Sequence, residues 1–198
     1  GGGSGGGGSA AGGDGQKPPT LLFVIDTSAS MCVTQELVGQ HEFKGSKKRE
    51  EEAAKLLQEM NAAHDGFGGS LRDQRTRHER TNVTYVSRLQ MVQAAIEAQI
   101  EETARTAPHT KVGLVAFAND VVVIGDGKQQ RVVVAGSKLD SFEKLNELSA
   151  SLEVERSVGE AKGDLLRELW NLEAEGATAL GPALQLAIRV AGKTPLSR

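Results

Sequence analysis

The chain has 198 residues and a formal net charge of −3, so it is long enough for one domain with a sizeable core and has no overall attraction to nucleic acid or to an anionic membrane. No apolar run approaches the roughly 18 residues of a membrane span, and the N-terminus lacks the basic and apolar regions of a signal peptide. Cys32 is the single cysteine, which excludes an internal disulfide and favours a reducing compartment. We therefore expect a soluble cytoplasmic protein whose partners include neither nucleic acid nor membrane.

Residues 1–19 are predicted to be a flexible linker. Almost all of the first 16 residues are Gly, Ser or Ala, which cannot offset the entropy of ordering by burial. The run GGGSGGGGS is typical of an expression linker, although a natural glycine-rich junction would have the same composition. The folded domain is expected over residues 20–198.

The first predicted strand, residues 21–25, is an unbroken apolar run of the kind that is buried on both faces of a parallel sheet. It stops at Asp26, and Ser28 and Ser30 follow at alternate positions. Open α/β sheets bind ligands at the carboxyl ends of their strands, and small oxygen donors suit Mg²⁺ or Mn²⁺. The sequence therefore predicts a metal site here. The alternative is that these side chains only cap the next helix or turn.

Residues 32–85 are predicted to be an insertion beside this loop. Within them, residues 47–64 have the narrow apolar stripe of a helix, and a glycine tract at residues 66–69 ends it. The basic cluster at residues 72–80 also contains acidic residues, which favours a solvated surface over a nucleic-acid site. Deleting residues 40–80 is expected to leave the core intact.

The helix after the insertion has strong start signals. Ser87 is predicted to be its N-cap, and Gln90 completes a capping box. The helix ends before Pro108 and leads into a second buried strand at residues 112–117. Turn residues then separate two short strands, which pair locally and make one edge of the sheet antiparallel. These short strands are predicted at residues 121–124 and 131–135.

Three predicted helices follow. Asp140 is expected to cap the first of them, and Pro182 suits the first turn of the last. The loop Gly176-Ala-Thr178 precedes the last helix, where the glycine allows close backbone approach and Thr178 presents a hydroxyl. The order of strands and helices predicts an α/β domain with a doubly wound, mostly parallel sheet and one antiparallel edge strand.

Two separated motifs resemble the metal-ion-dependent adhesion site of von Willebrand factor A-type (vWA) domains, which have a Rossmann-like fold. They are Asp26-x-Ser28-x-Ser30 after an apolar strand and Thr178 in a glycine-containing loop. The resemblance extends over most of the chain outside the linker and the insertion.

Within that family, two segments are most similar to the vWA domain of circularly permuted Ras-like proteins. They are residues 30–34, SMCVT, and residues 85–89, YVSRL. This closer resemblance implies that a permuted GTPase domain lies elsewhere in a larger protein.

The resemblance implies a role for each matching residue. Ser28 and Ser30 would coordinate Mg²⁺ or Mn²⁺ through their hydroxyls, Asp26 would bind the ion or its waters, and Thr178 would coordinate directly or through water. An Asp or Glu carboxylate from a partner protein would take the open position. The implied function is metal-dependent protein binding and not catalysis, with Ala29 standing where the family often has glycine.

The resemblance also implies a truncated domain. Family members carry a further aspartate after the next strand, and the chain ends at Arg198 before such a strand. The first strand would then expose an unpaired apolar edge, which favours self-association or completion by another chain.

The sequence leaves three alternatives to a metal-binding module. The strongest is a metal-free vWA-like scaffold in a larger multidomain protein. A phosphatase of the haloacid-dehalogenase type is disfavoured because it needs a second aspartate where Ser28 stands. A nucleotide-binding loop at residues 191–194 is rejected because its first glycine would fall at Ala187 and the motif follows a helix instead of a strand.

Overall fold

The computed structural model describes residues 18–46, 51, 83–151 and 154–192. Three sequence expectations therefore lie wholly or almost wholly outside the described residues. They are the linker, the helix over residues 47–64 and the basic cluster at residues 72–80. Among the described residues, no helix combines the length and the hydropathy that crossing a bilayer requires.

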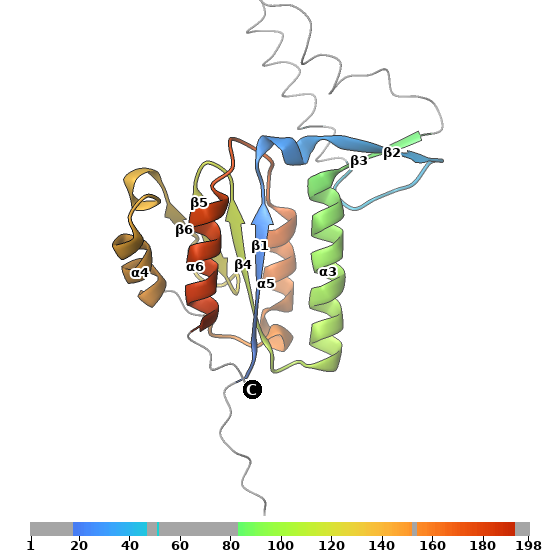
Figure 1. Ribbon diagram of the computed structural model, residues 1–198. Coiled ribbons are helices and arrows are strands. Elements are labelled where there is room, and N and C mark those ends of the chain that lie inside the picture. Colours follow the sequence, from blue (N-terminus) through green and yellow to red (C-terminus); the bar gives the residue numbers. More distant parts are fainter. Residues whose placement is uncertain (1–17, 47–50, 52–82, 152–153, 193–198) are drawn as a thin grey trace, which may run out of the picture.

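A four-stranded sheet with the strand order β1-β4-β5-β6 forms the centre of the molecule (Figure 1). β1 (Thr20–Asp26) is parallel to β4 (Lys111–Phe117), and the neighbours β5 (Val121–Gly125) and β6 (Val132–Val134) are antiparallel. The expected α/β class is confirmed. Within the described residues, however, one pair is parallel and two are antiparallel, where a mostly parallel sheet was expected. The physical reason is that short turns join β4, β5 and β6, and a parallel pair needs a long crossover.

Two helices cover each face of this sheet (Figure 1). One pair is α3 (Arg88–Thr106) and α5 (Val158–Trp170), and the other is α4 (Phe142–Ser151) and α6 (Leu180–Gly192). Two short 3₁₀ helices, η1 (Ala29–Cys32) and η2 (Gly136–Lys138), follow β1 and β6.

The alternation of side chains along the strands divides the core in two. Leu21 and Phe23 of β1 pack toward α3 and α5, whereas Leu22 and Val24 pack toward α4 and α6. The strands therefore need apolar residues at successive positions, as the sequence predicted.

The predicted capping box of α3 is confirmed. The Gln90 N–H donates to Ser87 Oγ at 3.1 Å, and the Ser87 N–H donates to Gln90 Oε1 at 3.0 Å. The prediction for α4 was wrong by one residue. Ser141, and not Asp140, directly precedes the helix, and its hydroxyl accepts the Lys144 N–H at 3.3 Å.

The base of the predicted insertion is an antiparallel ribbon of β2 (Thr34–Val38) and β3 (Val83–Ser87). Residues of the same segment also dock on the helices. The Lys44 ammonium pairs with Glu97 of α3 and lies 4.8 Å from the ring centroid of Trp170 in α5. The described segment after β2 is thus attached to the domain through Lys44.

Candidate metal centre

The carboxyl end of β1 is held firmly against β4. The Thr27 N–H donates to the Phe117 carbonyl at 2.8 Å, and the Thr27 hydroxyl donates to the same oxygen at 3.1 Å. Asp26 lies just before this anchor, and its Oδ1 accepts the Ser28 N–H at 2.7 Å. Such a bond from an aspartate to the amide two residues on turns the chain sharply. The carboxylate is thereby fixed at the point where the strand gives way to η1.

The two serines converge beside this carboxylate. Ser28 is buried at 2% exposure, and Ser30 lies on the exposed side of η1. Their hydroxyl oxygens are 3.1 Å apart. The turn of η1 supports this arrangement, because the Met31 N–H donates to the Ser28 carbonyl at 2.8 Å. The structure thus brings three of the four predicted residues together.

The chemistry of this donor set fits a small hard cation. Magnesium binds oxygen at about 2.0–2.1 Å in an octahedron, so two adjacent ligands lie about 3 Å apart. The separation of the Ser28 and Ser30 hydroxyls matches that spacing. Among the described residues, none donates a hydrogen bond to Asp26 Oδ2. The same hydroxyls can also simply bond to each other, as the metal-free alternative requires.

The loop that carries Thr178 is tied to this end of the sheet. The Ala29 N–H donates to the Gly176 carbonyl at 3.0 Å, and the Glu175 N–H donates to the Thr27 carbonyl at 2.7 Å. Gly176 has φ +70°, a left-handed conformation that favours glycine. Thr178 is exposed two residues further on. The structure therefore brings its loop against η1, while its role as a ligand remains a prediction.

Two residues that support the centre were missed at the sequence level. Thr27 anchors the loop as described above. Asn119, in the turn between β4 and β5, accepts the Ala177 N–H on Oδ1 at 2.7 Å. The available signal was an asparagine in a hairpin turn, which indicates a turn but not a partner 58 residues away.

The strongest electrostatic cluster lies elsewhere, after β5. Arg156 pairs with Asp126 at 3.3 Å and with Asp164 at 2.9 Å. Burial raises the pKa of Asp126, but hydrogen bonds from the Lys128 and Arg156 backbone and the Arg156 side chain outweigh it and hold that pKa below its ordinary value. Hydrogen bonds from Arg156 and then from Arg167 likewise lower the pKa of Asp164. These charges compensate one another, so the cluster is structural.

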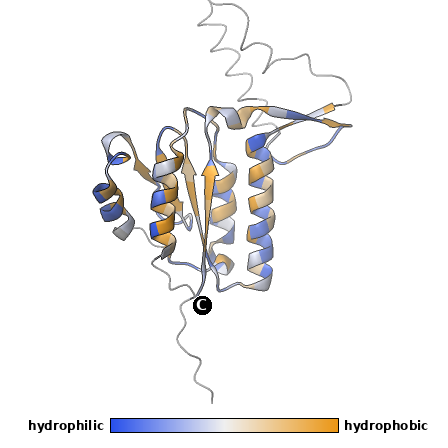
Figure 2. Cartoon of the chain, in the orientation of Figure 1, coloured by the Kyte–Doolittle hydropathy of each residue, from blue (hydrophilic) through white to orange (hydrophobic). Residues whose placement is uncertain are grey.

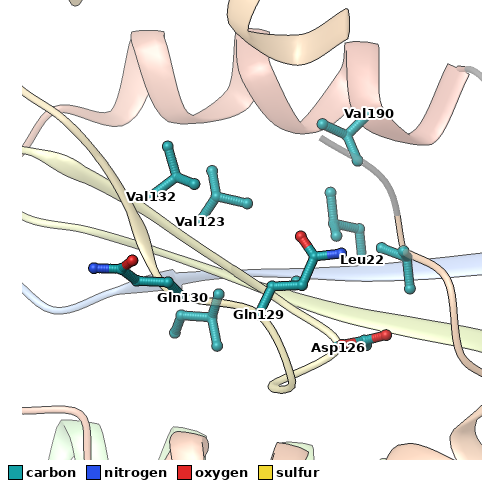
Figure 3. A pocket seen from close by; sticks show the side chains of 10 residues that line it. Leu22, Val123, Asp126, Gln129, Gln130, Val132 and Val190 are labelled. Atoms are coloured by element: carbon teal, nitrogen blue, oxygen red, sulfur yellow. The ribbon is translucent and has the colours of Figure 1, made fainter. Parts of the chain in front are cut away.

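A small hollow lies below α6 toward the amino ends of β1 and β4 (Figure 3). It is lined mainly by Leu22, Val123, Val132, Val190, Gln129 and Gln130. Its one carboxylate, Asp126, is already paired with Arg156. In the part of the chain that the structure describes, no three His, Cys, Asp or Glu side chains are placed to share an ion. The candidate centre at the end of β1 has a single carboxylate, Asp26, beside two serine hydroxyls.

Comparisons with known proteins give a distant relative. No family model matches the chain. The chain is 27% identical over 181 residues to "Circularly permutated Ras protein 1" of Dictyostelium discoideum, an alignment that covers 89% of this chain and spans 18% of the length of that protein. Among solved structures, an uncharacterized membrane spanning protein from Vibrio fischeri is similar with a TM-score of 0.37 and 16% identity, over 88% of this chain and 50% of that one.

Proposed function

We propose that this chain is a vWA-like, Rossmann-like module that binds Mg²⁺ or Mn²⁺ through Asp26, Ser28, Ser30 and Thr178. The observation that carries the proposal is the ligand-like spacing of 3.1 Å between the two serine hydroxyls, beside a carboxylate at the end of β1. The distant relationship to a circularly permutated Ras protein supports a place in a larger GTPase-containing protein. With a single cysteine, the proposed location is the cytoplasm.

The proposed mechanism is binding and not catalysis. The bound ion would supply positive charge for an Asp or Glu carboxylate of a partner protein. The chain's own residues hold the site: the Ser28 N–H orients the Asp26 carboxylate, and η1 sets the separation of Ser28 from Ser30. Because only one proposed ligand is charged and magnesium dehydrates reluctantly, affinity for the ion is expected to be weak.

Isothermal titration with Mg²⁺ and Mn²⁺ tests this function. The wild-type chain should bind one ion, and Ser28→Ala/Ser30→Ala should weaken binding by roughly tenfold or more because two ligands are lost. Ser137→Ala in the distant η2 is the control and should bind like the wild type. Absence of binding by the wild type would favour the metal-free scaffold.

A second proposal concerns the outer edge of β1. The Lys111 N–H donates to the Pro19 carbonyl and the Thr27 N–H to the Phe117 carbonyl, so odd-numbered residues of this segment bond to β4. By alternation, the backbone groups of Leu22 and Val24 point away from β4, where no described strand lies.

Apolar surface continues from this edge onto α6. Leu180, Leu184 and Ile188 form a stripe on the helix and are 48%, 43% and 69% exposed. Arg189 marks the opposite flank, where its guanidinium lies 4.3 Å from the Phe142 ring centroid of α4. The stripe therefore lies on the side where the sheet ends with β1.

We propose that this combined surface pairs with another strand, through self-association or a completing chain. Sedimentation over a range of concentrations tests self-association. If the protein is a monomer at every concentration, self-association is excluded and a different partner chain is the remaining proposal for this surface.

A further inference from the structure

Four hydrogen bonds to other described residues attach residues 175–179, which lead into α6, to the rest of the domain. Three join backbone to backbone: the amides of Glu175 and Ala179 donate to the carbonyls of Thr27 and Ala118, and the Ala29 amide donates to the Gly176 carbonyl. The fourth is the bond from the Ala177 N–H to Asn119 Oδ1 at 2.7 Å. These bonds secure the loop on both sides of Thr178.

Of these four hydrogen bonds, the one to Asn119 involves a side chain. A Cβ added at Gly176 would lie 2.6 Å from Asn119 Nδ2, so the carboxamide rests directly on the glycine backbone. The bond to Ala177 fixes the peptide between Gly176 and Ala177, one residue before Thr178. Asn119 therefore contacts the loop at Gly176 and Ala177, the two residues that precede Thr178.

We propose that Asn119 is a positioning residue that holds Thr178 toward Asp26, Ser28 and Ser30. The β4–β5 turn thereby sets the affinity of the site for a divalent cation. This inference rests on the proposed function for its metal-binding consequence. Its positioning statement concerns the loop itself and can be measured without a metal.

The first measurement is amide exchange of Ala177 by NMR in metal-free protein. Asn119→Ala should speed exchange of this amide roughly fivefold, the equivalent of one ordinary hydrogen bond. Asn119→Asp should keep the amide protected, because a carboxylate oxygen accepts the same N–H. Asp120→Ala truncates the neighbouring turn residue, which holds the turn through its backbone carbonyl, and should leave Ala177 unchanged. Unchanged exchange in Asn119→Ala would overturn the inference.

The second measurement is titration of the same variants with Mg²⁺ and Mn²⁺. Asn119→Ala should weaken binding about three- to tenfold, as for loss of an outer partner that orients a ligand. Asn119→Asp should bind at least as tightly as the wild type, because it keeps the bond and adds a negative charge nearby. A purely structural side chain would not give this rescue. Equal affinity of Asn119→Ala and the wild type would overturn the metal-binding consequence.

The two proposals fail in different ways. If the wild type binds neither ion while Asn119→Ala still frees the Ala177 amide, the proposed function fails and the loop-positioning role stands. If the wild type binds an ion and Asn119→Ala changes neither exchange nor affinity, the proposed function stands and Asn119 has no positioning role.

Discussion

β1 and β4 are neighbouring parallel strands with similarly apolar sequences, TLLFVID and KVGLVAF, yet their surroundings differ. Every residue of β4 after Lys111 is buried, whereas Ile25 alone is buried in β1. β4 lies between two strands, and β1 has one neighbour in the described sheet. β1 packs against helices on both faces, as predicted, but most of its residues are only half-buried because it is the last strand of the described sheet. Figure 2 shows β1 as a largely hydrophobic strand on the open side of the sheet. An apolar run thus predicts a strand but not its place in the strand order.

The largest effect should come from proline substitutions in β1. Phe23→Pro removes an N–H that faces β4 and should cost at least about 3 kcal/mol of unfolding free energy relative to Phe23→Ala. Val24→Pro removes an N–H that faces the open edge, so it should cost at least about 1 kcal/mol less relative to Val24→Ala. Urea unfolding measures both. Equal costs would show that the outer edge of β1 is paired in solution.

Matched leucine truncations compare the burial of the two strands on one face. Leu114→Ala in β4 should lower the free energy of unfolding by about 3 kcal/mol, because Leu114 is fully buried. Leu21 in β1 packs against the same core but is only half-buried. Leu21→Ala should therefore lower the free energy of unfolding by about half as much. Chemical denaturation gives the difference. A loss at Leu21 as large as that at Leu114 would mean that another chain covers β1.

The contact between the strands depends on Gly113. A Cβ there would lie 2.8 Å from both Leu22 and Val154, so Gly113→Ala should lower the free energy of unfolding by about 2 kcal/mol through overpacking. Gly163 in α5 has open space around it, and Gly163→Ala should instead stabilise by about 0.5 kcal/mol. Opposite signs in thermal unfolding are the expected result. Stabilisation by both substitutions would show that β1 moves to make room.

The smallest expected effect is a pH dependence of stability that comes from Asp126, which directly follows β5. The pKa of Asp126 is lower in the folded chain than its ordinary value of 3.8, so its stabilising contribution is complete above that value and is lost as pH falls below it. Arg156→Met should remove up to about 1 kcal/mol of the stability difference between pH 6 and pH 3.

Urea titrations at the two pH values measure this loss. Arg131→Met, which breaks the more exposed pair with Glu168, is the control and should retain the acid sensitivity. If Arg156→Met retained the same acid sensitivity, other carboxylates would have to be its source.

The sequence by itself determined the local features of this protein. The apolar runs of β1 and β4, the Ser87–Gln90 capping box and the small oxygen donors after β1 depend on residues within a few positions of one another. Their physical cause is backbone geometry and short-range hydrogen bonding, which a single segment contains.

The tertiary structure alone decided the position of β1 at the edge of the described sheet, the Asn119–Ala177 bond and the docking of Lys44 on Trp170. Each of these joins segments far apart in the sequence. Such contacts form only where packing of the whole domain brings the segments together, so no local pattern predicts them.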